Sequence, residues 1–186
     1  MRLFLSGLVL LASLAAAPAR AEPVVIDRVV AVVGPQPLLL SELRARAAPM
    51  IAQLDRTDVA PAARAAAERR LVDEVLQHLI DAELVAQAAA RAGVEVTTAE
   101  IDAGLTRVAA QNRVSVQELL VEARQQGFDE RLYRDEIGRQ ICEVKMLRLR
   151  PLPAGLDERQ HLEALERLRR TWLAELRRAT YVEIRL

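Results

Sequence analysis

Three side chains that could bind a divalent metal are the first candidates for chemistry in this sequence. Glu74, His78 and Asp81 stand at positions i, i+4 and i+7, so they would share one face of a helix. Carboxylate and imidazole groups ligate transition metals, but such a helix face is usually solvated charge and no second histidine lies nearby. We therefore predict a solvated face here and no metal site.

A second histidine and the single cysteine are the other candidates for a chemical role. His161 has Asp157 and Glu158 within one helical turn, a spacing typical of a charged pair on the surface. Cys142 is the only cysteine, which excludes an internal disulfide, and its apolar-periodic position favours a buried, unreactive thiol.

Motifs for catalysis are missing from the sequence. The seven glycines are widely separated, so no phosphate-cradling loop is present, and no G-x-S-x-G motif occurs. A lone cysteine with two histidines also makes a nucleophilic site a poor interpretation. We predict no catalytic residues and no cofactor.

The start of the chain is typical of a cleavable export signal. Arg2 precedes an apolar run over residues 3–14, and residues 15–21 are small and end in an A-x-A site. An uncleaved membrane anchor is the alternative, but a spanning helix needs about 20 apolar residues. We expect cleavage after Ala21, with Glu22 as the new N-terminus, and a mature chain that is not embedded in the membrane.

The charge of the mature chain argues against two classes of partner. The whole chain has 26 Lys and Arg against 26 Asp and Glu. Residues 1–21 hold two arginines and no acidic residue, so the mature chain carries a net charge of about −2. This balance provides no electrostatic basis for binding nucleic acid or an anionic membrane surface.

The mature chain is predicted to open with a hairpin. Residues 24–33 are rich in β-branched side chains and predict a strand, residues 34–37 predict a turn, and residues 38–40 predict a second strand. Ser41 is suited to cap a helix over residues 42–54.

Helices dominate the middle of the chain. A polar linker at residues 55–61 leads to a long predicted helix over residues 62–92. Capping boxes at residues 97–100 and 115–118 each open a further helix, and Asp129 caps the next one. The apolar stripe of the long helix is Leu71, Val75, Leu79, Ile80, Leu84 and Ala88. The apolar face of the helix after Asp129 is Leu132, Tyr133, Ile137, Ile141, Val144 and Leu147.

The end of the chain returns to a strand. Residues 151–155 break the helical pattern, residues 156–179 predict an amphipathic helix, and residues 181–186 alternate between apolar and polar like a strand. Because a lone strand is not stable, this strand needs a partner, and the N-terminal hairpin is the only sheet available. The two ends of the chain should therefore meet in one small sheet. The apolar face of the last helix is Leu162, Leu165, Leu168, Trp172 and Leu176.

The helices carry a surplus of apolar surface that has two interpretations. It can form the core, or it can form a groove for an apolar segment of another chain. Periodicity alone does not separate these interpretations, and core is the one that we favour from the residues.

Several segments of the mature chain form a recognisable ordered set: residues 25–34, 39–43, 76–81, 92–97, 111–115, 133–137, 172–177, 179 and 181–184. This set resembles the SurA family, which comprises periplasmic chaperones of outer-membrane protein biogenesis. The resemblance covers most of the mature chain and implies a mainly α fold. That fold is a multi-helix SurA N-terminal domain, similar to the C-terminal domain of trigger factor, with a small sheet from the N-terminal hairpin and the C-terminal strand.

The resemblance also implies a domain organisation. Residues 1–21 would be the signal peptide, residues 22–150 the chaperone region, and residues 156–186 a helix and strand that complete the same core domain. Family members usually carry one or two parvulin-type prolyl isomerase domains of roughly a hundred residues between these regions. Residues 151–155 leave no room for such a domain, so we expect that the chain is not an enzyme.

The expected function is that of an ATP-independent periplasmic chaperone for unfolded or extended segments of outer-membrane proteins. The client would bind in a cleft between the helical lobe and the C-terminal helix. One alternative is a prolyl isomerase, by family label only; another is a non-catalytic adaptor that completes its fold with a partner or as a domain-swapped homodimer. The peptide-binding residues expected near the cleft are Leu120, Phe128, Tyr133, Ile137 and Met146.

Overall fold

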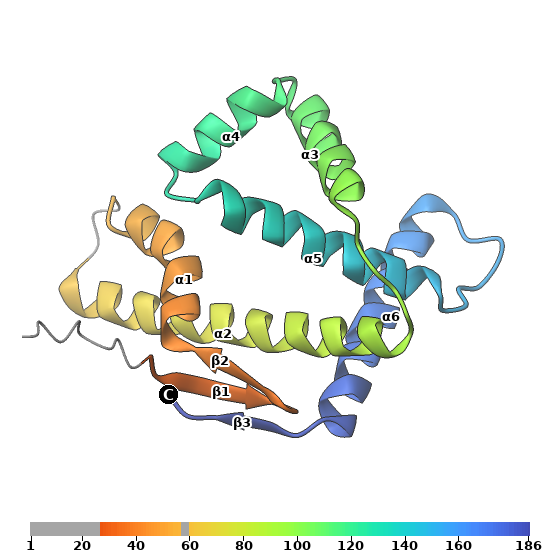
Figure 1. Ribbon diagram of the computed structural model, residues 1–186, viewed down its shortest axis with the longest axis horizontal. Coiled ribbons are helices and arrows are strands. Elements are labelled where there is room, and N and C mark those ends of the chain that lie inside the picture. Colours follow the sequence, from red (N-terminus) through yellow and green to blue (C-terminus); the bar gives the residue numbers. More distant parts are fainter. Residues whose placement is uncertain (1–26, 57–59) are drawn as a thin grey trace, which may run out of the picture.

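The computed structural model describes residues 27–56 and 60–186, so the predicted export signal lies outside the described residues. Within these ranges the chain forms six helices and a three-stranded sheet (Figure 1). This confirms the predicted mainly α fold. The bounds are β1 Val29–Val33, β2 Gln36–Leu39, α1 Leu40–Leu54, α2 Pro61–Arg91, α3 Thr98–Asn112, α4 Val116–Gln125, α5 Glu130–Arg148, α6 Glu158–Ala179 and β3 Val182–Ile184.

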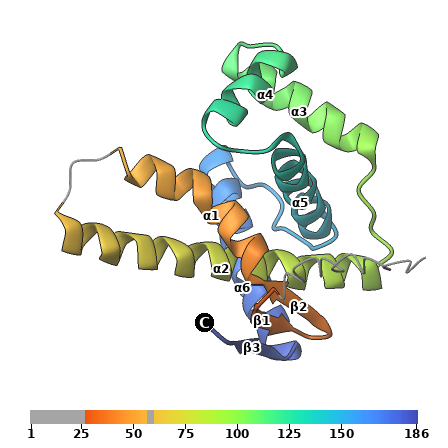
Figure 2. The same cartoon turned by 60° about the vertical axis from the view of Figure 1, so that its left-hand side comes forward.

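The long helix α2 separates two parts of the molecule. In both views the sheet lies on one side of α2, and α3, α4 and α5 lie on the other (Figures 1 and 2). In Figure 1 these three helices form a triangle. We call α3, α4 and α5 together the arm. None of the helices in the described ranges is long and apolar enough to cross a membrane.

The sheet joins the two ends of the described chain, as predicted. Its strand order is β2-β1-β3, and both pairings are antiparallel. Gly34 turns the hairpin with φ of +56°, and its backbone N–H donates to the carbonyl of Tyr181 at 2.7 Å. The first strand is shorter than the predicted 24–33: it begins at Val29, and residues 24–26 lie outside the described ranges.

The start of α1 corrects one expectation. Ser41 does not cap this helix, because α1 begins at Leu40 with Leu39 in the N-cap position and no side-chain cap bond from it. Asp27 supplies the missing acceptor instead. Its carboxylate accepts hydrogen bonds from the Ser41 backbone N–H (3.2 Å) and from the Ser41 hydroxyl. A carboxylate at a helix N-terminus satisfies a free N–H group and favours the helix dipole.

Helix α2 is buried more widely than one stripe. It packs against α1, α5, α6 and the sheet. The predicted stripe is buried except for Leu71, which is half-buried, and Leu76, Val85 and Ala89 are buried beside it. Because α2 has neighbours on several sides, more of its residues are buried than the single predicted stripe contains. Gln87 adds a polar tie, donating from Nε2 to the carbonyl of Val33 at 2.9 Å.

The arm contains both predicted capping boxes. The Thr97 hydroxyl accepts from Glu100 N at 3.3 Å, and the Ser115 hydroxyl accepts from Glu118 N at 3.1 Å. Asp129 caps α5 by accepting from the backbone of its first turn. One position of the predicted α5 face is wrong: Val144 is 46% exposed, because the hollow that it borders between α3 and α5 is open to solvent.

Helix α6 folds back onto α2. Trp172 is 2% exposed, and Leu173 and Leu176 are buried beside it. Leu162 was expected on this face but is 63% exposed, because the buried contacts of α6 begin only at Ala164. Asp157 caps α6 and accepts from Gln160 N at 2.8 Å, while His161 is exposed.

Candidate functional site

An apolar groove of about 380 Å³ lies where α1, α2 and the start of α5 come together. Helix α1 contributes its second half, α2 contributes its middle, and the loop before α5 closes one end. Most of the exposed surface in the groove is apolar, and Arg46, Glu74, His78 and Glu136 complete the lining. Its apolar residues are Met50, Leu71, Val75, Phe128, Leu132 and Tyr133.

Two aromatic rings form the wall contributed by the arm. The rings of Phe128 and Tyr133 pack edge to face, with centroids 6.4 Å apart and an interplanar angle of 70°. Gly127, at φ of +93°, allows the chain to turn between α4 and α5 and lies against Pro49 of α1. Partial burial raises the pKa of the Tyr133 hydroxyl.

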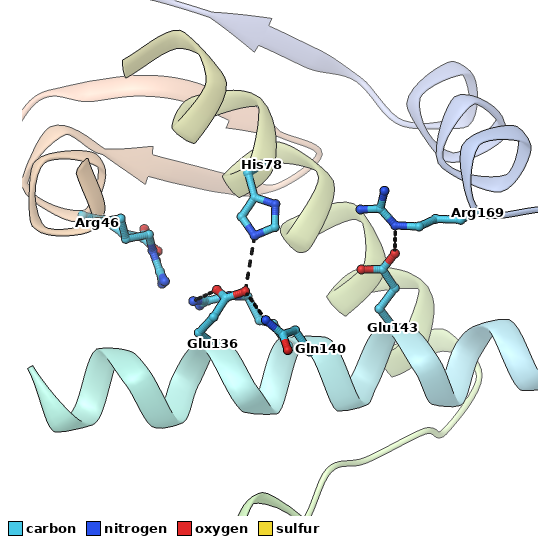
Figure 3. A network of polar contacts seen from close by, with 8 residues as sticks. Arg46, His78, Glu136, Gln140, Glu143 and Arg169 are labelled. Atoms are coloured by element: carbon cyan, nitrogen blue, oxygen red, sulfur yellow. Dashed lines mark hydrogen bonds and ion pairs between the residues drawn. The ribbon is translucent and has the colours of Figure 1, made fainter. Parts of the chain in front are cut away.

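One polar contact joins α2 and α5 beside the groove, between His78 and Glu136, which both line it. His78 of α2 reaches toward Glu136 of α5, with 3.5 Å between Nε2 and Oε1 (Figure 3). Arg139 and Gln140 of α5 also donate to Glu136, at 2.8 and 3.1 Å. The hydrogen bond from His78, followed by those from Arg139, holds the pKa of Glu136 well below its ordinary value. The same bond raises the pKa of His78.

Arg46 of α1 lines the groove and also has a buried donor without a partner in the described part of the chain. Its Nη2 donates to Glu42 one turn earlier in α1, at 3.1 Å. Its Nε is buried and has no hydrogen-bond partner among the described residues. Burying such a donor unpaired has a cost.

A second cavity lies where the cleft was expected, between the helical lobe and α6. It holds only about 40 Å³ and has many charged residues in its lining. Glu143 of α5 and Arg169 of α6 form an ion pair there (Figure 3). The larger apolar space therefore lies on the α1 side of α5, away from α6.

The structure separates the five residues expected to bind peptide. Phe128 and Tyr133 line the apolar groove. Ile137 and Met146 are 7% and 6% exposed, and Met146 belongs to the main core. Leu120 is half-buried on α4. Whether any of the five contacts a client stays a prediction.

Sequence reasoning did not identify the α1 side of the groove. Met50 is 41% exposed and projects from the helix expected over residues 42–54, for which no apolar face was predicted. Leu71, placed in the core stripe, and Leu132, placed on the α5 face, both line the groove. Their half-burial depends on how far α1 and α5 stand from α2, which periodicity does not encode.

The three residues considered as metal ligands have separate roles. His78 pairs with Glu136 of α5, while Asp81 accepts from Arg177 of α6 at 2.7 Å. Glu74 lines the groove. Across residues 27–56 and 60–186, no three His, Cys, Asp or Glu side chains are grouped to hold a metal ion.

Comparison with known proteins identifies the family of this chain. Residues 26–149 match the SurA N-terminal domain family. A protein named Chaperone SurA from Cupriavidus pinatubonensis is 40% identical over 121 residues, which is 65% of this chain and 23% of that protein. The Chaperone SurA of Alkalilimnicola ehrlichii is 34% identical over 144 residues, 76% of this chain and 32% of that protein. The matched part of the chain thus spans only 23% and 32% of the length of these two relatives.

Proposed function

This chain belongs to the SurA N-terminal domain family, and from that premise we propose that it is an ATP-independent chaperone for unfolded or extended segments of outer-membrane proteins. The observation that carries the proposal is the apolar groove between α1, α2 and α5. The names of the relatives support a chaperone role.

The groove suits an extended segment of another chain. In an extended segment, alternate side chains point the same way. Every second side chain would therefore point into the groove, and those that are apolar would be buried there. Burial of one such side chain is worth about 1.5–3 kcal/mol, and ordering the segment offsets part of this gain. Binding should therefore be weak and reversible, as release of a client without ATP requires.

The compartment and the domain boundaries are parts of the same proposal. We propose a periplasmic location, reached by the signal in residues 1–21 with cleavage after Ala21. Residues 22–150 would form the chaperone region, residues 151–155 a linker, and residues 156–186 the helix and strand that complete the core. The pairing of β3 with β1 and the packing of α6 on α2 support the last boundary.

Suppression of aggregation tests the chaperone proposal. A β-barrel outer-membrane protein is unfolded in denaturant and diluted into buffer with the mature chain, and light scattering is followed. We expect scattering to fall as the chain is added in increasing molar excess. Unchanged scattering at several-fold excess would count against chaperone activity.

A pair of variants tests the groove itself. Met50→Glu places a charge in the groove and should weaken the suppression of aggregation. Leu162→Glu is the matched control, because Leu162 is also an exposed apolar residue on a helix but lies on α6, outside the groove. Equal loss in both variants would show that general surface hydrophobicity acts, and the groove assignment would be withdrawn.

The proposed chaperone is not an enzyme, in line with the short connection over residues 149–157 between α5 and α6. A proline-isomerisation assay on the purified mature chain should show no rate above the uncatalysed reaction. Clear turnover would overturn this part of the proposal.

Exchange of α6 between two copies remains a proposal about partners. Within one chain, Arg177 of α6 already donates to Asp81 and Gln77 of α2, at 2.7 and 2.8 Å. The same contacts would form between two copies if the 149–157 connection opened. A solution mass equal to one chain at high concentration would exclude this dimer.

A further inference from the structure

Among residues 27–56 and 60–186, the sheet ends on an open edge at β3. β3 pairs with β1 on one side, and it is the last strand in the order β2-β1-β3. In both views β3 lies at the outer margin of the molecule (Figures 1 and 2). Exposed apolar side chains gather along it: Tyr181, Ile184 and Leu186 are 64%, 49% and 54% exposed.

The backbone groups at this edge can be assigned from the hydrogen bonds to β1. Gly34 N donates to Tyr181 O at 2.7 Å, and Arg185 N donates to Val30 O at 2.8 Å. In an antiparallel pair, residues alternate between facing the partner strand and facing away. Tyr181, Glu183 and Arg185 therefore point their backbone groups at β1. Val182 and Ile184 point their N–H and C=O groups outward, where a further strand would bind.

The opposite edge of the sheet is closed to a further strand. In β2, Pro37 pairs with Val32 of β1. Val32 also lies opposite Glu183, so its backbone groups point toward β3, and those of Pro37 point to the outer edge. Proline has no N–H to donate and is one of the residues that blunt natural edges. β3 has no proline, so the two edges of the sheet differ in their ability to accept a strand.

The residues of the open edge are self-complementary about Ile184. The residues next to Ile184 carry opposite charges: Glu183 on one side and Arg185 on the other. The residues beyond them, Val182 and Leu186, are both apolar. Glu183 and Arg185 lie on one face of the strand, while the apolar residues lie on the other. Glu183 and Arg185 already pair within the strand, at 2.8 Å.

We propose that the β3 edge is a self-association surface, on which β3 of a second copy of this chain pairs antiparallel about a two-fold axis at Ile184. In this register Ile184 faces Ile184 of the second copy, and the outward N–H and C=O groups of both strands are satisfied. Glu183 lies opposite Arg185 of the second copy, twice by symmetry, and Val182 lies opposite Leu186. Cross-strand pairs of opposite charge and of apolar residues stabilise sheets. A two-fold contact uses the same patch on both copies, which the self-complementary sequence satisfies.

The size of the contact sets the expected strength. One pair of short strands buries less than the roughly 1,200 Å² that marks the lower end of stable interfaces. The dimer should therefore be weak, forming only as the concentration rises. It is independent of the proposed chaperone activity, since the groove lies on the other side of α2.

Analytical sedimentation of the wild type and of charge-reversal variants tests the proposal. The mass of the species is measured at protein concentrations that differ by several powers of ten. The wild-type mass should rise from one chain toward two. Glu183→Arg and Arg185→Glu should each keep the chain monomeric, because like charges then face each other across the strands. The double variant E183R/R185E restores opposite charges and should recover the dimer. Wild-type chain that stays monomeric throughout, or a double variant that stays monomeric, would overturn the register.

Ile184→Pro separates this surface from other modes of assembly. Proline at 184 removes only an outward N–H, so pairing with β1 and the thermal unfolding midpoint should be retained while the dimer is lost. Hydrogen exchange at the amides of Val182 and Ile184 should slow with rising concentration in the wild type. A dimer in Ile184→Pro, or rapid exchange at these amides in a dimeric sample, would assign association to another surface such as exchanged α6. Slowing of these amides only on addition of an extended peptide would identify a different occupant and overturn the proposal.

Discussion

Lys145 links two helices of the arm through a single ammonium group. Its Nζ donates to the carbonyl of Glu95 at 2.6 Å and to Oε1 of Glu100 at 2.7 Å. Glu100 also accepts from the backbone N–H of Thr97 at 2.8 Å, as part of the capping box of α3. The hydrogen bond from Lys145, and then that from Thr97, lower the pKa of Glu100 to about 2. The start of α3 is thus tied to the end of α5.

Lys145→Met tests this link. The pKa of Glu100 should rise from about 2 toward its ordinary value without reaching it, because Thr97 still donates. Carboxyl titration by NMR measures the change. Glu118 is the matched control: its pKa is lowered by the bonds from Ser115 alone, so it should not move. An unchanged pKa at Glu100 would mean that the hydrogen bonds of the capping box alone account for its lowered pKa.

The His78–Glu136 pair makes stability depend on pH. The pKa of His78 is raised in the folded protein, so the stability from the pair is fully present below the unfolded histidine pKa and is lost as pH rises through the folded pKa. The pKa of Glu136 is lowered, so its contribution is lost only in more acidic solution. His78→Gln should therefore lower the free energy of unfolding more at about pH 5 than at about pH 8.

The size of this effect is limited by solvent. The His78 side chain is 53% exposed, so the difference should be at most about 1 kcal/mol. Denaturant unfolding at each pH measures it. If the difference in free energy of unfolding between wild type and His78→Gln were the same at every pH in this range, the ionisation of the pair would not be linked to folding.

At the scale of elements, the arm depends on a close approach between α3 and α5. A Cβ built on Gly104 of α3 would lie 2.8 Å from Cγ2 of Ile137 and 3.1 Å from Cδ1 of Ile141. Real contacts of this kind are not that short, and both neighbours are buried or half-buried. Glycine is therefore required at 104 by packing, since a helical φ suits any residue.

Gly104→Ala should destabilise the chain although alanine favours a helix. Alanine gains about 1 kcal/mol in helix propensity, while overpacking costs about 1–3 kcal/mol, so we expect a net loss of about 1 kcal/mol. Gly138→Ala is the control. Its Cβ would lie 3.3 Å from Cδ1 of Ile101, the mobile end of a side chain, so the two effects should nearly cancel. Urea unfolding of the two variants gives the comparison, and a more stable Gly104→Ala would contradict the close approach.

The elements themselves were largely predictable from sequence, because their signals are local. The capping boxes at Thr97 and Ser115 give the starts of α3 and α4, and the residues in between have strong helix propensity. The start of α1 was misplaced, because its cap comes from Asp27, which lies on the far side of the hairpin. A cap supplied by a distant residue leaves no pattern in the neighbouring sequence.

At the scale of the whole molecule, α2 is the helix on which both ends of the described part of the chain assemble. The hairpin, α1, α5 and α6 each pack on it, and β3 closes the sheet beside it. The meeting of the two ends followed from one physical argument, that a lone strand needs a partner. The groove did not follow in the same way. Phe128 and Tyr133 were found by type, but Met50 and Leu132 join them only through the angles between three helices.

Trp172 should couple α6 to the stability of the whole molecule. It is 2% exposed in the main core, and the guanidinium of Arg150 lies over its ring at 4.6 Å. Replacing a buried tryptophan with alanine costs about 3–5 kcal/mol, through lost burial and the cavity that remains. Because the core around Trp172 also contains residues of α2 and β1, Trp172→Ala should lower the midpoint of a single cooperative transition.

Denaturant unfolding followed by far-ultraviolet circular dichroism measures this prediction. Leu162→Ala is the matched control on the same helix, since Leu162 is 63% exposed. Its effect should stay within about 0.5 kcal/mol, as for most surface substitutions. If Trp172→Ala instead produced a separate early transition, with the remaining helices unfolding at the wild-type midpoint, α6 and β3 would be an independently docking unit. The assembly of both chain ends on α2 would then have to be described as two folding units.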